Sequence, residues 1–196
     1  MYNILSETEM ETKESIRKET IRRLRDQDPR LREERSIKIQ KKLLSDEGFK
    51  VAGTVMSYVS LPTEVNTEYF NKTALEQRKK VVVPYIGPNS NTIVAAELKR
   101  IEDLEKGPFG IYQPKDGTTN KIPAEEIDLV IVPAIAYDED NVRLGRGKGY
   151  YDRFLSGQGS ILEKTIGLAF SFQVFEHLPR GPHDRPVSRV ITDRSD

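Results

Sequence analysis

The residue types that could do chemistry are concentrated in one short segment of the chain, residues 143–153. Its basic side chains are Arg143, Arg146, Lys148 and Arg153, and its glycines stand at alternate positions, Gly145, Gly147 and Gly149. Glycines let a backbone curl with its amide groups turned inward, and Lys and Arg neutralise the charge of bound phosphates. The segment therefore predicts a phosphate-binding loop.

The spacing in this segment differs from two common phosphate-binding patterns. A Walker loop needs Gly-Lys-Ser/Thr, and the dinucleotide fingerprint needs Gly-x-Gly-x-x-Gly directly after the first strand. A flexible solvated turn is the simple alternative, but the sequence context favours a site. The apolar run 129–132 ends shortly before the loop, and a helix is expected at 150–155. Ligands bind beyond the carboxyl ends of strands, and the start of a helix offers free amides to anions.

Composition narrows the chemistry further. The chain has no Cys and only two His, so a thiolate nucleophile, a disulfide and a Cys-ligated metal are excluded, and a multi-His metal site is not expected. Any metal should be a hard ion held by oxygen, such as Mg²⁺. The 31 Lys and Arg balance the 31 Asp and Glu, so no global positive field favours nucleic-acid binding.

The elements that must position this loop follow from periodicity. Helical spacing predicts helices at 12–27 and 29–46, the second stopped at Gly48, and shorter helices at 66–78 and 150–155. Strands are expected at 51–59, 80–85, 92–98, 127–132, 165–170 and 187–192, with a surface loop at 114–124. The run 129–132 is apolar on both faces, as in a central strand. This order predicts a single-domain, three-layer α/β/α sandwich with a central parallel or mixed sheet.

Length and termini complete this outline. A chain of 196 residues suits one domain, 1–196, with residues 1–11 expected to be a flexible amino-terminal extension. No apolar run approaches the ~18 residues of a membrane span. The amino terminus shows neither a signal peptide nor a lipidation motif, so we expect a cytoplasmic protein.

Segment 143–152 closely resembles the signature of the 5-formyltetrahydrofolate cyclo-ligase (5,10-methenyltetrahydrofolate synthetase) family. Four weaker features fit the same family. They are Lys-x-x-x-Arg at 13–17, the loop 58–67 with its central Glu64, Gly-Ile-Tyr-Gln-Pro at 110–114, and His-Asp at 183–184. Two positions depart from the family pattern, because Gln113 stands where Glu is frequent and Ser188 where Asp is common. The resemblance spans about residues 13–193.

The resemblance implies an enzyme, a ligase that forms a C–N bond. It implies conversion of 5-formyltetrahydrofolate to 5,10-methenyltetrahydrofolate with hydrolysis of MgATP to ADP and phosphate. The formyl oxygen would attack the γ-phosphate, N10 would close the ring, and phosphate would leave. Such a reaction needs no side-chain nucleophile, only in-line positioning and cations around the transferring group.

The resemblance also implies roles for individual residues. The catalytic cations would be Lys148 and Arg146. ATP would be bound by Lys13, Arg17, Arg143, Leu144, Gly145, Arg146, Gly147, Lys148, Gly149, Tyr150 and Tyr151. The folate would be bound by Glu64, Arg146, Gly147, Lys148, Gly149 and Tyr150, and Mg²⁺ by Asp152 and Asp184. Of the two tyrosines, one is expected to face the ligand.

Plainer interpretations stand beside these roles. Lys13 and Arg17 could belong to an ordinary solvated helix face, Asp152 could be a capping residue, and Asp184, between two prolines, could serve a turn. For the whole chain, one alternative is an ATP-dependent relative of the same fold that acts on another pterin or a thiamine-related molecule. The other is an RNA-binding protein that uses the Arg/Gly/Tyr segment. The expected partners are ATP and 5-formyltetrahydrofolate, without nucleic acid or membrane, and the expected state is a monomer.

Overall fold

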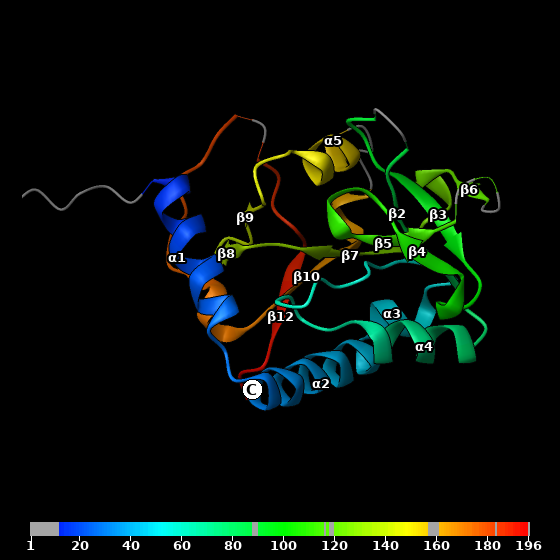
Figure 1. Cartoon of the computed structure of the whole chain (residues 1–196), viewed down its shortest axis with the longest axis horizontal. Coiled ribbons are helices and arrows are strands. Elements are labelled where there is room, and N and C mark those ends of the chain that lie inside the picture. The colour runs from blue at the N-terminus through cyan, green and yellow to red at the C-terminus, as the bar shows by residue number, and fades with distance from the viewer. Residues whose placement is uncertain are drawn as a thin grey trace, which may run out of the picture.

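A computed structural model describes residues 12–87, 90–115, 117, 120–156, 161–182 and 184–195. Its centre is a seven-stranded sheet in the order β12-β10-β7-β1-β2-β3-β6 (Figure 1). The strands are β12 (Arg189–Thr192), β10 (Thr165–Ala169), β7 (Leu129–Pro133), β1 (Thr54–Met56), β2 (Lys80–Tyr85), β3 (Val94–Leu98) and β6 (Lys121–Ile122). The first five run parallel to one another, whereas β3 pairs antiparallel with both β2 and β6. The predicted α/β fold is confirmed, with a mixed sheet.

Alternate side chains of the central strands enter two separate hydrophobic cores. Val55 and Ile131 belong to one core, whereas their neighbours Met56 and Val130 belong to the other. This is the period of two that a strand imposes on its side chains. β7 lies between β10 and β1 with Leu129–Val132 buried, so the prediction of a central strand at 129–132 is confirmed.

Helices cover both faces of the sheet but unequally. The helices α2 (Pro29–Ser45), α3 (Glu47–Val51) and α4 (Glu68–Glu76) lie on one face, and α5 (Tyr150–Ser156) lies on the other (Figure 1). The first helix, α1 (Lys13–Arg25), sits at the side of the sheet, where Ile16 packs against Leu144 and Leu178. The three predicted layers are therefore present, with a thin layer on the α5 side.

The two amino-terminal helices begin where their capping residues dictate. Thr12 caps α1 by accepting a hydrogen bond from the Ser15 amide at 3.1 Å. Asp28 caps α2 by accepting from the Arg30 and Leu31 amides at 2.9 and 3.0 Å, and Pro29 occupies the first turn, where its missing N–H costs nothing. The predicted helices at 12–27 and 29–46 are confirmed within two residues.

The predicted stop at Gly48 is wrong. α2 ends at Ser45 because Asp46 adopts an extended backbone (ψ 136°) and caps the next helix by accepting from the Phe49 amide at 3.3 Å. Gly48 therefore lies inside α3. For the same reason the strand predicted at 51–59 is too long, since Val51 is still helical and β1 covers only Thr54–Met56.

Several short strands escape the sequence periodicity. β8 (Ala136–Asp138) and β9 (Arg143–Leu144) form a hairpin between β7 and the glycine-rich loop, where no strand was predicted, and β11 (Val174–Phe175) pairs with β8. β4 (Leu104–Lys106) pairs with β5 (Tyr112–Pro114), so the predicted loop 114–124 includes the end of one strand and all of β6. Strands of two or three residues are too short to show a period.

None of the helices in the described residues is both long enough and apolar enough to cross a membrane. The prediction of a flexible extension at 1–11 lies outside the described residues, as does His183.

Candidate active site

A cavity of about 140 Å³ opens at the carboxyl ends of three adjacent strands, β2, β1 and β7. In chain order, β2 is added on one side of β1 and β7 is later added on the other side. The strand order therefore reverses at β1, and the crevice lies at this switch point. A larger hollow of about 530 Å³ adjoins it. Both are lined by Val59, Leu61, Glu64 and Tyr112.

The glycine-rich loop forms one wall of the smaller cavity, and its glycines are needed for two different reasons. Gly147 and Gly149 have left-handed backbones, with φ of 91° and 66°, which side chains disfavour. At Gly145 the constraint is space, because a Cβ there would lie 2.7 Å from a guanidinium nitrogen of Arg143. The loop therefore curls as the sequence predicts.

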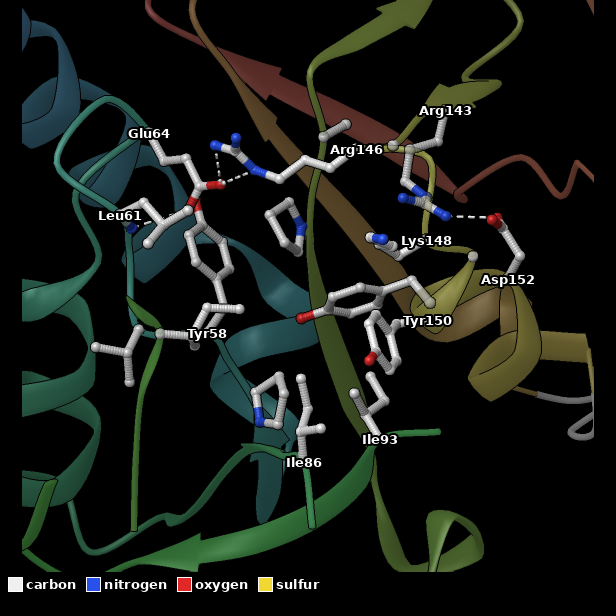
Figure 2. Close-up of a pocket in the computed structure, with 18 of the residues that line it drawn as sticks. Tyr58, Leu61, Glu64, Ile86, Ile93, Arg143, Arg146, Lys148, Tyr150 and Asp152 are labelled. Carbon is white, nitrogen blue, oxygen red and sulfur yellow. Dashed lines mark hydrogen bonds and ion pairs between the residues drawn. The ribbon is translucent and has the colours of Figure 1, made fainter. Parts of the chain in front are cut away.

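Arg143 is the most buried cation of the loop. Its side chain is 5% exposed and forms an ion pair with Asp152 (Figure 2). The guanidinium also lies 5.7 Å from the centre of the Tyr151 ring, and its Nε has no hydrogen-bond partner in the described structure. Leu144 beside it is buried under α1, so only its backbone is available to a ligand.

Arg146 reaches across the cavity to Glu64 (Figure 2). Its Nη2 and Nε donate to one carboxylate oxygen of Glu64 at 2.9 and 3.2 Å, and the other oxygen accepts from the Leu61 amide at 2.9 Å. Glu64 is 12% exposed, so its carboxylate is directed into the site by two partners. The sequence predicts both residues as ligand-binding, and the structure brings them together.

Lys148 and Arg153 differ sharply in their surroundings. Lys148 is exposed and lines the cavity, and its side-chain amine has no ion pair or hydrogen bond with any described residue. Arg153 donates to the carbonyl oxygens of Asn91 and Lys148 and lies 5.3 Å from the ring centre of Tyr150. Arg153 therefore fastens the loop to the segment that precedes β3, while the Lys148 amine is available to a ligand.

α1 supplies two more cations to the same loop. Arg17 Nε donates to the Gly145 carbonyl at 2.9 Å, and Lys13 forms an ion pair with Asp184. Lys13 and Arg17, four residues apart on α1, therefore share one helix face, and that face is turned to the loop. Burial alone would raise the pKa of Asp184, but the hydrogen bonds from Lys13 and the Gly181 amide outweigh it and keep this pKa below its ordinary value.

The rest of the cavity wall is apolar and aromatic. Tyr150 packs against Phe109, with ring centres 6.2 Å apart, and its hydroxyl lies 3.4 Å from the Ser90 carbonyl oxygen. Tyr150 and Tyr151 both line the cavity, and the expectation that one of them faces the ligand stays a prediction. Sequence reasoning missed the flat apolar wall of Pro84, Ile86, Ile93, Ile111, Pro133 and Ala134. The only signal for it is that several of these residues follow predicted strands.

Comparisons with known proteins identify the family of this chain. The model of the 5-formyltetrahydrofolate cyclo-ligase family matches residues 9–193. The chain belongs to this family. A mouse 5-formyltetrahydrofolate cyclo-ligase is 29% identical over 191 residues, covering 93% of this chain and 94% of its own. A *Haemophilus influenzae* protein of the same name is 30% identical, covering 71% of this chain and 75% of its own.

Solved structures agree with this membership. The NMR structure of *Aquifex aeolicus* 5,10-methenyltetrahydrofolate synthetase has 32% identity and a TM-score of 0.81, covering 93% of this chain and 90% of its own. A synthetase structure from *Mycoplasma pneumoniae*, at 24% identity and a TM-score of 0.74, shares the fold over 93% of this chain and 99% of its own.

The departure from the cyclo-ligase pattern at Gln113 has a structural explanation. The Gln113 side-chain oxygen accepts from the Ile86 amide at 3.0 Å, and its nitrogen donates to the Ile86 carbonyl at 3.3 Å. An amide can do both at once, whereas an ionised carboxylate only accepts. In this cyclo-ligase Gln113 thus clamps β5 to the end of β2. Nothing in the structure explains Ser188, whose amide donates to Thr165.

The two aspartates predicted to bind Mg²⁺ have oxygen donors of the right kind. Each already has a basic partner, Arg143 for Asp152 and Lys13 for Asp184, and no group of three or more His, Cys, Asp or Glu in the described residues could hold a metal. The charge of Arg143 also lowers the pKa of Asp184 in part. Two carboxylates suit a metal ion that arrives with most of its ligands already bound. Mg²⁺ binding by Asp152 and Asp184 stays a prediction.

Proposed function

We propose that this chain converts 5-formyltetrahydrofolate to 5,10-methenyltetrahydrofolate with ATP as the phosphoryl donor. The family match over residues 9–193 supports the overall conversion. The single observation that supports the ATP-dependent mechanism is that the curled cationic loop and Glu64 line one cavity, where they could bind a phosphate and a pterin side by side. This reaction requires neither a cysteine nucleophile nor a multi-histidine metal site.

The reaction balances without a protein nucleophile. The formyl oxygen attacks the γ-phosphorus, a new P–O bond forms, and the bond to the bridging oxygen breaks to release ADP. N10 then adds to the activated formyl carbon and loses its proton. Cleavage of the C–O bond expels inorganic phosphate and leaves the methenyl bridge. The enzyme's task is to align the reacting atoms and to neutralise charge on the transferred group.

Lys148, Arg17 and Lys13 are the cations that we assign to the phosphates. Lys148 is unpaired in the described structure, and its amine can approach the γ-phosphate without first losing a partner. Arg17 and Lys13 approach the loop from α1, where residues four apart share a face. Arg143 is held by Asp152, so we assign it to shaping the loop and to the electrostatic field of the site.

Glu64 is the residue that we assign to the folate. A carboxylate accepts paired hydrogen bonds from the 2-amino and N3–H groups of a pterin, and one Glu64 oxygen already accepts from the Leu61 amide. The Arg146 side chain occupies the other oxygen. Because Arg146 is 42% exposed, this ion pair is worth at most about 1 kcal/mol. Incoming substrate therefore displaces Arg146 at small cost and frees it for a phosphate.

We further propose that Mg²⁺ enters with ATP and is held by Asp152 and Asp184. When bound, the ion would screen the charge of the phosphate oxygens. Each aspartate then has to exchange a basic partner, Arg143 or Lys13, for the metal. The cytoplasmic location and the monomeric state stay predictions.

The decisive experiment mixes protein, MgATP and 5-formyltetrahydrofolate and follows the near-ultraviolet absorbance of methenyltetrahydrofolate. We expect a rise that requires ATP and is accompanied by equimolar ADP. No ATP-dependent rise in a folded protein would refute the function. ATP turnover with another pterin or with a thiamine-related compound, but none with 5-formyltetrahydrofolate, would instead support the alternative of a same-fold relative.

A further inference from the structure

Among the described residues that line the cavity, one buried hydroxyl has no hydrogen-bond partner. The hydroxyls of two other buried tyrosines are satisfied. Tyr58 Oη donates to the Val65 carbonyl at 3.0 Å, and Tyr137 Oη donates to the Val132 carbonyl at 2.7 Å. Tyr151 Oη is buried, lines the cavity, and has no hydrogen-bond partner in the described structure.

A second unpartnered donor lies beside it. Arg143 Nε is also buried without a partner, and the Arg143 guanidinium lies 5.7 Å from the centre of the Tyr151 ring. Among the described residues with buried unpaired polar atoms, these two line the smaller cavity. The Nε group only donates hydrogen bonds, and the hydroxyl can donate its proton. A ligand that satisfies both must therefore bring electron-rich acceptor oxygens.

The hydroxyl keeps its proton under ordinary conditions. Burial raises the pKa of Tyr151 far above its usual value; the charge of Arg143 lowers this pKa in part, and the nearby Glu64 carboxylate raises it again. Tyr151 lines the same cavity as Glu64, the residue that we assign to the pterin.

From this geometry we infer that Tyr151 binds the folate substrate by donating a hydrogen bond from Oη to a carbonyl oxygen of the reduced pterin, either the 4-oxo or the 5-formyl oxygen. The inference rests on the proposed function and deepens it. The family resemblance assigns Tyr151 to ATP only. A phenylalanine would fill the same space without leaving a buried hydroxyl unpaired, so the hydroxyl is best explained by a partner that arrives with the ligand.

The test compares Tyr151→Phe with the matched control Tyr137→Phe. Removing an unpaired hydroxyl should leave the Tm of Tyr151→Phe equal to that of wild type or higher, while the affinity for 5-formyltetrahydrofolate, measured without ATP, falls about ten- to hundredfold. Binding of a non-hydrolysable ATP analogue should be unchanged. Tyr137→Phe loses the bond to Val132, so its Tm should fall while the folded protein binds folate normally.

Several outcomes would overturn the inference. These are unchanged folate affinity in Tyr151→Phe, a loss confined to the ATP analogue, or a drop in Tm like that of Tyr137→Phe. Tetrahydrofolate, which lacks the formyl group, identifies the acceptor. An effect that persists with tetrahydrofolate assigns the 4-oxo oxygen, and one that disappears assigns the formyl oxygen. If wild-type protein forms no methenyltetrahydrofolate, the proposed function fails first, independently of the variant.

Discussion

Replacement of Lys148 by alanine should separate catalysis from stability. Lys148 is exposed and pairs with no described residue, so its removal should change the free energy of unfolding by no more than ~0.5 kcal/mol. An ammonium about 4 Å from a transferring phosphoryl charge contributes up to ~4 kcal/mol at an effective dielectric constant of about 20. Because solvent reaches this lysine, we discount that figure to ~2–4 kcal/mol, which is about a 30- to 1,000-fold loss of kcat/KM.

The assay is ATP-dependent methenyltetrahydrofolate formation, run beside urea unfolding of the same preparations. The matched control is Lys72→Ala, because Lys72 is an exposed lysine of α4 that lines neither cavity. It should retain both activity and stability. The reasoning is refuted if Lys148→Ala keeps kcat/KM within threefold of wild type (about 0.6 kcal/mol), or if its activity loss is matched by an equivalent loss of stability.

Three further predictions concern the glycine-rich loop, the Gln113 side chain and the stability of the protein at low pH. Gly147→Ala and Gly117→Ala both place a side chain at positive φ (91° and 74°), so each should lower Tm by about 2–4 °C. Only Gly147→Ala should lose turnover, and equal losses of turnover in the two variants would contradict this. Gln113→Ala leaves both Ile86 backbone groups unpaired and should cost ~2–4 kcal/mol by urea unfolding, whereas an unchanged midpoint would rule out the clamp. The pKa of Asp184 is lowered in the fold, so its stabilisation is present above about pH 4 and is lost as pH falls through the folded-state pKa. The stability difference between wild type and Asp184→Asn should vanish there, and a difference independent of pH would refute this assignment.

Many of the helices and strands were predictable because the sequence features that specify them are local. The strand predicted at 80–85 matches β2 at both ends, because basic residues precede its apolar run and Gly87 follows shortly after it. Capping at Asp28 and the break at Pro29 locate the start of α2. The glycine-basic loop was found for the same reason, because its amide-exposing curl is encoded by residues within a span of ten.

The partner of each charged side chain was not predictable, because partners come from distant parts of the chain. Sequence treats Arg143, Arg146 and Lys148 as equivalent cations. The fold buries the first beside Asp152, pairs the second with Glu64, which is 82 residues away, and leaves the third unpaired in the described structure. Glu64 was expected to bind the folate, but its pairing with Arg146 depends on tertiary geometry alone.

The contacts of α1 set the order in which this site can form. Arg17 meets Gly145, 128 residues away, and Lys13 meets Asp184, 171 residues away. Contacts of such long sequence separation form late, because the intervening chain must first be ordered. A nascent chain on the ribosome therefore exposes the basic face of α1 until almost the last residues have emerged. Proteolytic removal of α1 from the mature protein would therefore take Arg17 and Lys13 away from the loop, and it would also uncover the main core, in which Leu24 of α1 is buried.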